Sequence, residues 1–431
     1  MSILAQNITF PVWVSMIEDY IQATLRQRLE RTACIFSRLL VHYKHSRHID
    51  ASPAWRIENI SLSLGIGFGH PETQNMNLHI HGHVLPGDKE QDIYVVNGHI
   101  TFQKVKDAKT VVKDGYILPG LVDCHAHLSL ASPAGDEASS EERVRASAKE
   151  HLHAGVLAIR EPGSPDYASK EIRPDEGLPR VQTGGRFLAP PGRYFPGLAW
   201  EVEEDNLPGA AEEEARKSGA WAKIIGDFPG EDGRFHPNFR LETLRQAAER
   251  VHKLGARIAI HSVIPESIEM AIEAGFDSIE HGTMLEANHI VEMARRKMTL
   301  VPTMVIREGI LELVRGFGLT ADESRRVEIA VKKQAEMVRK AVEAGVMVLA
   351  GTDAGIVAHG IVRREIENFF EAGIPGEIAL GAGSWTARAF LGLPGIEERA
   401  HADLVVFAKD PRQDKEVLSK PTYIMLDGRQ V

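Results

Sequence analysis

The chain has 431 residues, of which 43% are hydrophobic, and 50 Lys and Arg against 60 Asp and Glu give a formal net charge of −10. This length suits one large domain with a smaller one, and an acidic chain without basic and aromatic clusters is not expected to bind nucleic acid. Two cysteines, Cys34 and Cys124, are too few for a disulfide framework. With no secretory start and no apolar run near the ~20 residues that span a bilayer, we expect a cytoplasmic protein without membrane insertion.

Residues 1–75 differ from the rest of the chain. They contain an amphipathic helical pattern, VWVSMIEDYIQATLRQRLERTACIFSRLLVHY, followed by an irregular, glycine-containing stretch. Met76 stands directly before an alternating pattern. The sequence therefore predicts a helical and irregular extension, and suggests that the functional protein begins at Met76. The intact mass of the natively expressed protein tests this, and a mass that includes residue 1 would contradict it.

Both ends of the remaining chain carry strand patterns. Apolar and polar residues alternate in NLHIHGHVL and DIYVVNGHITF after residue 76, and again in ADLVVFAKD and TYIMLDGRQV after residue 400. Strands from the two ends can pair. We therefore predict a small β-sandwich domain formed by residues 76–116 and 395–431.

The central residues 117–394 alternate between short apolar runs and helical patterns. Eight apolar runs begin near residues 120, 155, 180, 221, 257, 278, 299 and 346, and helical spacing is clearest over 141–155, 240–256, 265–276, 287–297 and 323–345. Eight strand and helix units favour an α/β fold of the (β/α)8 TIM-barrel type over a doubly wound sheet.

Polar residues at the ends of the predicted strands are the candidate site, because active sites of such barrels lie at the carboxyl ends of the strands. Alternate residues of a strand face the same way, so both histidines of GLVDCHAH can reach one ion. A lone histidine or lysine would more often be a core or solvated residue. Here, however, five predicted strands contribute candidates to one barrel mouth, and we predict that they bind metal: His125, His127, Lys223, His261, His281 and Asp353.

Imidazole and carboxylate ligands without thiolate suit Zn²⁺, Mn²⁺, Co²⁺ or Fe²⁺, and Zn²⁺ is the usual ion for hydrolysis. Alternation turns Cys124 away from the barrel axis. A cationic Lys223 would repel metal ions. This conflict is resolved if burial lowers the lysine pKa and the amine reacts with CO2, because the resulting carbamate can bridge two ions.

Two other histidine groups have the same spacing. His151 and His153 lie in a helical pattern, where residues two apart point roughly 200° away from each other, so they cannot share an ion. His79, His81 and His83 alternate on a predicted strand with no carboxylate or thiolate at comparable positions nearby. We interpret them as a solvated strand face.

Three further residues are candidates for substrate binding. Arg160 ends the second predicted strand and could bind a substrate carboxylate or brace a loop. The segment LAPPGRYFPGLAWEVEEDNLPG after the third strand reads as a long loop over the barrel mouth, where Arg193 and Tyr194 could contact an anionic or aromatic group or face solvent.

At this point the chain resembles the amidohydrolase superfamily, and within it the imidazolonepropionase-like and Xaa-Pro dipeptidase (prolidase)-like hydrolases. The resemblance covers about residues 77–431 and rests on PGLVDCHAH, AGVLAIREPGSPD, WAKIIGD, IAIHS, SIEHG, AGTDAG with a following HG, and ADLVVFAKDP, in that order. Many relatives carry Gly-Gly-His after the third strand, and this chain does not. The resemblance therefore predicts the chemistry better than the substrate.

The resemblance implies that two ions are bound. His125, His127 and Asp353 would hold one ion, His261 and His281 the other, and carboxylated Lys223 would bridge them. It also implies that Asp353 transfers protons, that His359 of the HG motif supports the site or contacts substrate, and that the protein can form homo-oligomers.

The predicted function is hydrolysis, by metal-activated hydroxide, of an amide-type C–N bond in a small molecule: a dipeptide, an N-acyl amino acid or a cyclic amide. One alternative is a mononuclear deaminase or cyclic-amide hydrolase of the same superfamily, in which Lys223 is an ordinary strand residue. A second alternative is a non-catalytic scaffold with the same fold, although all six ligand positions are filled.

Overall fold

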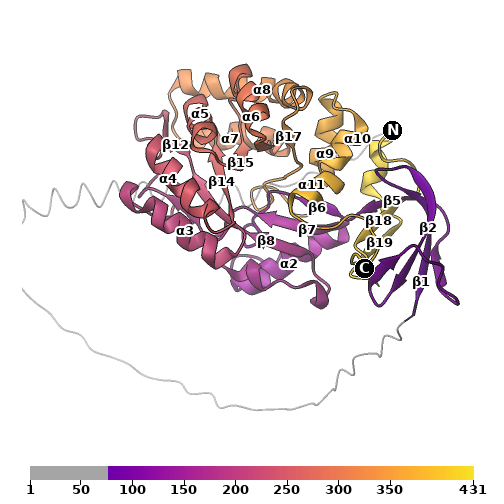
Figure 1. Cartoon of the computed structure of the whole chain (residues 1–431). Coiled ribbons are helices and arrows are strands. Elements are labelled where there is room, and N and C mark those ends of the chain that lie inside the picture. Colours follow the sequence, from indigo (N-terminus) through magenta and orange to yellow (C-terminus); the bar gives the residue numbers. More distant parts are fainter. Residues whose placement is uncertain (1–75) are drawn as a thin grey trace, which may run out of the picture.

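A computed structural model describes residues 76–431 of the protein (Figure 1). The helical pattern predicted within residues 1–75, Cys34 and the hypothesis of a start at Met76 concern the part of the chain before this range. Among the described residues, no helix combines the length and apolar composition that crossing a membrane requires.

The two ends of the described chain form one sheet. Its strand order is β20-β19-β18-β5-β1-β2-β3, and β4 also pairs with β1. Antiparallel pairing of β5 with β18 joins the two ends, as Figure 1 shows for the indigo and yellow strands. A sandwich was predicted, whereas the hydrogen bonds connect these strands into one sheet that branches at β1. The strands are β1 Leu78–Val84, β2 Lys89–Val96, β3 His99–Thr101, β4 Lys109–Val112, β5 Tyr116–Pro119, β18 Leu404–Phe407, β19 Tyr423–Leu426 and β20 Arg429–Gln430.

Alternation and turn residues explain this sheet. Ile80 of β1 is fully buried, whereas the histidines on either side of it remain partly exposed. Asn97 and Gly98 both have positive φ, 50° and 81°, at the tight turn between β2 and β3. A two-residue hairpin turn of this type needs left-handed backbone at both positions, which Asn-Gly adopts readily.

Parallel strands make up the centre of the molecule. Strands β6 Leu121–Asp123, β7 Val156–Glu161 and β8 Arg180–Thr183 form a three-stranded sheet. A second sheet has the order β10-β9-β11-β14-β15-β16-β17. Most of these strands are buried, as expected where helices cover a parallel sheet, whereas β8 and β10 are only partly buried. The strands of the second sheet are β9 Phe187–Ala189, β10 Ala199–Glu201, β11 Trp221–Ile225, β14 Arg257–Ser262, β15 Ser278–His281, β16 Thr299–Val301 and β17 Met347–Val348.

Backbone hydrogen bonds also connect the two parallel sheets. The Cys124 N–H, just after β6, donates to the Ala350 carbonyl just after β17 over 2.9 Å. Elsewhere, the Ser164 N–H, after β7, donates to the Gly185 carbonyl, between β8 and β9, over 2.9 Å. Gly185 lies where the third predicted strand is interrupted into β8 and β9, so one predicted strand contributes to both sheets.

Helices between the strands cover the parallel sheets (Figure 1). Five match the predicted patterns: α2 Ser140–His153, α4 Leu241–His252, α5 Pro265–Ala274, α6 Ala287–Arg296 and α8 Ala321–Glu343. Five were not predicted: α3 Leu207–Ser218, α7 Arg307–Gly316, α9 Val362–Glu371, α10 Gly376–Gly381 and α11 Trp385–Phe390. An antiparallel hairpin of β12 Asp227–Pro229 and β13 Phe235–Pro237 was also not predicted. The described chain is thus a mixed α/β protein.

The segment predicted as a long loop over the barrel mouth is more ordered than expected. It contains β10, which pairs in parallel with β9, and its end enters α3 at Leu207. The irregular part that can contact the site is therefore restricted to residues 190–198.

Candidate active site

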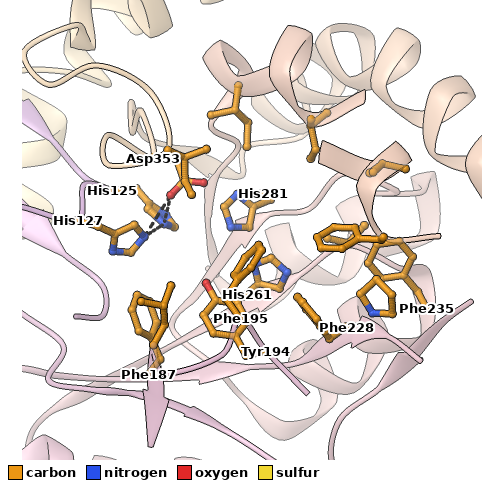
Figure 2. A pocket seen from close by; sticks show the side chains of 18 of the residues that line it. His125, His127, Phe187, Tyr194, Phe195, Phe228, Phe235, His261, His281 and Asp353 are labelled. Atoms are coloured by element: carbon orange, nitrogen blue, oxygen red, sulfur yellow. Dashed lines mark hydrogen bonds and ion pairs between the residues drawn. The ribbon is translucent and has the colours of Figure 1, made fainter. Parts of the chain in front are cut away.

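All six predicted metal ligands line one cavity at the carboxyl ends of the parallel strands. Figure 2 shows the four histidines and Asp353. His125 and His127 follow β6 instead of lying within it, and Asp353 follows β17. His281 is the last residue of β15. Lys223 was predicted at a strand end but is the third residue of β11, so its side chain enters the cavity from below the strand ends.

Three of these side chains point ligand atoms at one place. The Asp353 Oδ1 lies 3.4 Å from the His125 Nε2 and 3.1 Å from the His127 Nε2, and the two Nε2 atoms are 3.2 Å apart. The other ring nitrogens are engaged. The His125 Nδ1–H donates to the Glu280 Oε2 over 2.6 Å, and the His127 Nδ1–H donates to the Gly163 carbonyl over 2.7 Å. These bonds fix the tautomers that leave both Nε2 lone pairs free, as metal-binding histidines require.

Two further histidines extend this group into the cavity. The His281 ring lies 5.0 Å from the His125 ring and 4.7 Å from the His261 ring, centroid to centroid. The His281 Nδ1 is hydrogen-bonded to the Thr303 Oγ1 over 2.8 Å, which leaves its Nε2 for another partner. Burial lowers the pKa of His261 to about 3, and nearby Lys223 adds to this effect, so the ring stays neutral and can donate a lone pair.

Two of the proposed ligands have an unusual backbone conformation. Asp353 and His281 have φ values of 57° and 68°, in the left-handed region that residues other than glycine rarely adopt. Such strain persists only where the surrounding structure holds it, and it often marks functional sites. The ligand atoms of His125, His281 and Asp353 all lie within 4.8 Å of one another.

The Lys223 amine has no hydrogen-bond partner. Its Nζ is buried in the floor of the cavity, and burial lowers the pKa of the amine to about 8. An unpaired buried amine is costly, because a lysine normally keeps its charged end in water. This group is therefore available for a reaction or a ligand that the fold itself does not supply.

A charged network beneath the ligands was not predicted. Glu280 is fully buried and accepts from His125, from the Ser278 hydroxyl over 2.6 Å and from the Arg160 Nη2 over 2.6 Å. Although burial opposes ionisation, Arg160 and Lys223 hold the pKa of Glu280 well below its ordinary value. The strand pattern singled out His281 only. Its neighbour Glu280 shares the inward face with Ser278, two residues earlier, and positive φ at His281 lets the next side chain enter the interior as well.

The suggestion that Arg160 binds a substrate carboxylate is corrected by this network. The guanidinium is fully buried, and it also donates to the Cys124 carbonyl over 2.7 Å and to the Ser278 Oγ over 3.0 Å. Its third donor group is bound to Glu280. Each of the three guanidinium nitrogens thus has a partner below the cavity, and Arg160 is not among the residues that line the cavity, so its place is to support the site.

Comparisons with known proteins agree with this geometry. Residues 116–431 match the model of the Amidohydrolase family. An uncharacterized protein of Mycobacterium tuberculosis (strain ATCC 25618 / H37Rv) is 36% identical over 348 residues, which are 80% of this chain and 93% of that protein. The chain belongs to the amidohydrolase family.

Solved amidohydrolase-like structures share its fold. A Xaa-Pro dipeptidase with bound methionine superposes with a TM-score of 0.70 at 22% identity, over 82% of this chain and 99% of that one. The A. niger ochratoxinase superposes with a TM-score of 0.69 at 19% identity, over 82% and 95% of the two chains. The fold is thus prolidase-like. Because the two neighbours are named for different substrates, the fold alone does not select one.

The residues of this amidohydrolase fit the metal that the family implies. Imidazole nitrogens with fixed tautomers and a carboxylate converge in a buried place, which is a donor set suited to a divalent first-row metal. Without a cation, the two Nε2 lone pairs and the carboxylate oxygen would face one another with little compensation. The buried Lys223 amine, which has no hydrogen-bond partner, is further support for a ligand that the fold itself does not supply.

Of the predicted substrate residues in the loop of this amidohydrolase, only Tyr194 reaches the cavity. Burial and the charge of Asp353 raise the pKa of Tyr194, so its phenol stays protonated. Arg193 points elsewhere. Its guanidinium donates to the Phe228 and His236 carbonyls over 2.6 and 3.0 Å, and thereby fastens the loop to the β12–β13 hairpin.

His359 lies beside the site and does not line the cavity. Its Nε2–H donates to the Leu130 carbonyl over 2.9 Å, and its Nδ1 accepts from the His151 Nε2–H over 3.3 Å. His151 is fully buried and His153 is exposed, which agrees with the opposite directions expected on a helix. His151 is nevertheless part of the support for the site, because its ring links α2 to the loop that carries His359.

The third histidine group lies on β1 at the surface. The interpretation of a solvated strand face overlooked its carboxylates, which come from the neighbouring strand β2 through the pairing of His81 with Asp92. The Asp92 Oδ1 lies 2.8 Å from the His79 Nε2 and 2.9 Å from the His81 Nδ1. Cross-strand partners depend on register, which the β1 sequence does not contain.

A second buried carboxylate was missed at β12. Asp227 accepts from the Val263 and Ile264 N–H groups over 2.7 and 3.1 Å, while its Oδ1 has no partner and lies 3.9 Å from the His261 Nε2. Burial raises the pKa of Asp227 to about 7. Its position directly after Lys223-Ile-Ile-Gly was a signal, since it follows a predicted strand.

Proposed function

We propose that this amidohydrolase is a binuclear metal-dependent hydrolase that cleaves an amide-type C–N bond. In this proposal His125, His127 and Asp353 would hold one divalent ion, Zn²⁺, and His261 and His281 would hold the other. Lys223, carboxylated by CO2, bridges the two. The fold and family support hydrolase chemistry in general, and the side chains described above support these assignments.

The observation that carries the proposal is the buried Lys223 amine. It shares a cavity with four histidines and Asp353, and its Nζ has no hydrogen-bond partner. A single ion could be satisfied by His125, His127 and Asp353 without any lysine. A carbamate at this position would supply both the negative charge and the two oxygens that a second ion needs.

The reaction would divide the work between the ions and the chain. Bound ions would act as Lewis acids toward the carbonyl and make hydroxide available at neutral pH. Asp353 would accept the proton of the attacking water and return it to the leaving nitrogen. Glu280 and the Gly163 carbonyl would keep His125 and His127 in the required tautomers. Tyr194 and the aromatic residues around it would exclude bulk water.

We also infer that the two parallel sheets close into one (β/α)8 barrel. The Cys124–Ala350 bond joins the ends of β6 and β17, and the Ser164–Gly185 bond joins the end of β7 to the connection between β8 and β9. The His127 N–H further donates to the Ala354 carbonyl over 2.7 Å. Closure would bring the ends of the first and last strands together, which is the placement that His125, His127 and Asp353 require to share an ion.

Metal content per chain tests the binuclear proposal. We would purify the wild type, Lys223→Ala and the exposed-lysine control Lys332→Ala in parallel with bicarbonate present. About two ions in the wild type and the control, falling to one or none in Lys223→Ala, are expected for a bridged pair of ions. A wild type that contains two ions and hydrolyses no amide would contradict the proposed reaction but not the site.

A mononuclear enzyme is the second candidate, and one observation favours it. His125, His281 and Asp353 bring three ligand atoms within 4.8 Å of one another, which is enough to hold one ion without Lys223. One ion per chain, unchanged in Lys223→Ala, would support this candidate. Absence of bound metal from all three proteins would favour a non-catalytic scaffold.

A further inference from the structure

The cavity above the proposed metal ligands has an aromatic wall. Figure 2 shows Phe187, Tyr194 and Phe195 on one side of the histidines, and Phe228 and Phe235 beyond His261. Phe317, which directly follows α7, also lines the cavity. The histidines and Asp353 form a polar floor, so the part of a substrate that extends away from the reacting bond would lie against carbon.

The aromatic wall is assembled from three separate segments. The Phe195 ring lies 5.5 Å from the Phe228 ring and 5.9 Å from the Phe317 ring, and the Phe228 and Phe317 rings are 5.4 Å apart. Edge-on and tilted contacts at these distances are favourable, so the rings support one another. The segments are also joined through the backbone, since the Thr320 N–H donates to the Gly233 carbonyl over 2.9 Å.

The described lining of the aromatic wall includes no cation besides Lys223 in the floor. Among the described residues that line the cavity, the ionisable side chains are the six proposed ligands and Tyr194. Two arginines close to the cavity are engaged elsewhere: Arg160 is bound to Glu280 beneath the floor, and Arg193 donates to backbone carbonyls of the hairpin. A carboxylate placed against this wall would be desolvated without a partner, which is strongly unfavourable.

We propose that the substrate is a neutral amide-type compound with an aromatic or branched apolar group next to the scissile bond. This rests on the proposed function and narrows it, because dipeptides and N-acyl amino acids carry a carboxylate beside the leaving nitrogen. The aromatic wall would bind the apolar group and orient the carbonyl toward the polar floor. Discrimination between neutral amides and amides that carry a carboxylate would arise mainly from the free-energy cost of burying the carboxylate.

Binding of two matched sulfonamides tests this inference independently of turnover. N-(2-phenylethyl)benzenesulfonamide and N-(benzenesulfonyl)phenylalanine differ by one carboxylate, and both resist hydrolysis. Calorimetry on the metal-loaded protein should give a Kd at least about tenfold lower for the neutral compound, since an unpaired buried charge is poorly tolerated. Equal or tighter binding of the carboxylate, or binding of neither compound, would overturn the inference.

Three variants assign the effect to the aromatic wall. Phe228→Ala should weaken binding of the neutral sulfonamide by about tenfold through lost apolar contact, with metal content unchanged. Phe102→Ala, a matched change at an exposed phenylalanine directly after β3, should have no effect. Leu198→Arg adds a cation at a half-buried lining residue. It should reduce or reverse the preference for the neutral sulfonamide over the sulfonamide that carries a carboxylate. Unchanged binding in both Phe228→Ala and Leu198→Arg would contradict the assignment.

The same pair as amides separates this inference from the proposed function. The metal-loaded enzyme should hydrolyse N-(2-phenylethyl)benzamide with a kcat/KM at least about tenfold above that for N-benzoylphenylalanine. Selective sulfonamide binding without hydrolysis of either amide would preserve the substrate class and contradict the reaction. Faster hydrolysis of N-benzoylphenylalanine would preserve the reaction and contradict the substrate class.

Discussion

Two groups of histidines with the same spacing occupy opposite environments in this molecule. His125 and His127 are buried, and each uses its Nδ1 for a bond within the protein while its Nε2 faces Asp353. His79 and His81 on β1 are partly exposed and also share a carboxylate, that of Asp92.

The difference lies in which nitrogens are already satisfied. At the surface, His79 bonds Thr110 through Nδ1 and Asp92 through Nε2, and His81 bonds Asp92 and Glu90 through its two nitrogens. No lone pair of these rings is reserved for an ion, and solvent stabilises whatever charge remains. Histidine spacing alone therefore does not make a metal site; burial and the partner of the second nitrogen decide it.

The carboxylates that lie between the paired histidines provide the sharpest test. Asp353→Asn should lower kcat by about 10²- to 10⁴-fold, because it removes the proposed proton shuttle. Asp92→Asn, which makes the equivalent change at the surface, should leave kcat unchanged. Steady-state kinetics on an amide substrate, with metal content measured in parallel, checks both. Near-normal turnover in metal-loaded Asp353→Asn would rule out the shuttle role.

Removal of the Arg160 charge, which supports the buried histidines through Glu280, should lower the stability of the fold. Arg160→Met leaves Glu280 buried without its cation, which should lower the free energy of unfolding by about 3–5 kcal/mol. Glu90→Gln, which alters an acceptor of exposed His81, should leave the free energy of unfolding unchanged within error. Urea unfolding followed by circular dichroism measures both. Equal, small effects would show that the buried network does not depend on its charge.

Matched threonines hold one histidine in each region. Thr303→Ala frees the His281 Nδ1 from a bond of 2.8 Å, and Thr110→Ala frees the His79 Nδ1 from a bond of 2.9 Å. Loss of an outer-shell bond typically weakens metal affinity by about 10- to 100-fold, so we expect that effect in Thr303→Ala and none in Thr110→Ala. Competition with a chelator measures the affinity. A loss in Thr110→Ala would place a functional ion at the surface.

Two histidines outside the proposed ligand set should have pKa values that are shifted in opposite directions from the ordinary value. Hydrogen bonding to Asp92 raises the pKa of His81 above 6.5, whereas burial lowers the pKa of His359 to about 4. The His81 contribution to stability is thus present below pH 6.5 and is lost as the pH rises through its folded-state pKa. The His359 contribution has the other sign: stability falls as the pH drops from about 6.5 toward 4, because the unfolded chain binds the proton first.

NMR titration with His81→Gln and His359→Gln for assignment checks these directions. In Asp92→Asn, the pKa of His81 should move back toward its ordinary value. A His359 ring that titrates near pH 6.5 would show that the pair with His151 is open to solvent.

The order of strands and helices explains how much the sequence could predict. Apolar runs separated by helical patterns placed His125, His261, His281 and Asp353 at strand ends, and the structure brings them into one cavity. These residues follow from local periodicity, because the topology of a parallel sheet collects the carboxyl ends of its strands. The Amidohydrolase family assignment was also confirmed.

The sequence analysis missed interactions that depend on a second segment of the chain or on local backbone conformation. Arg160 was predicted either to bind a substrate carboxylate or to brace a loop, and its actual partners Ser278 and Glu280 come from a strand more than a hundred residues later. Glu280 was hidden because period-two alternation excludes a residue next to His281. Asp92 was hidden because cross-strand register is set by the turn and not by β1. Local pattern fixes neither long-range pairing nor strained backbone.

Anomalous diffraction at the absorption edge of the bound metal tests the central claim most directly. The account predicts two anomalous peaks per chain, one beside His125, His127 and Asp353 and one beside His261 and His281, with extra density on the Lys223 Nζ between them. Peaks at His79 and His81, or a single peak beside an unmodified Lys223, would contradict it.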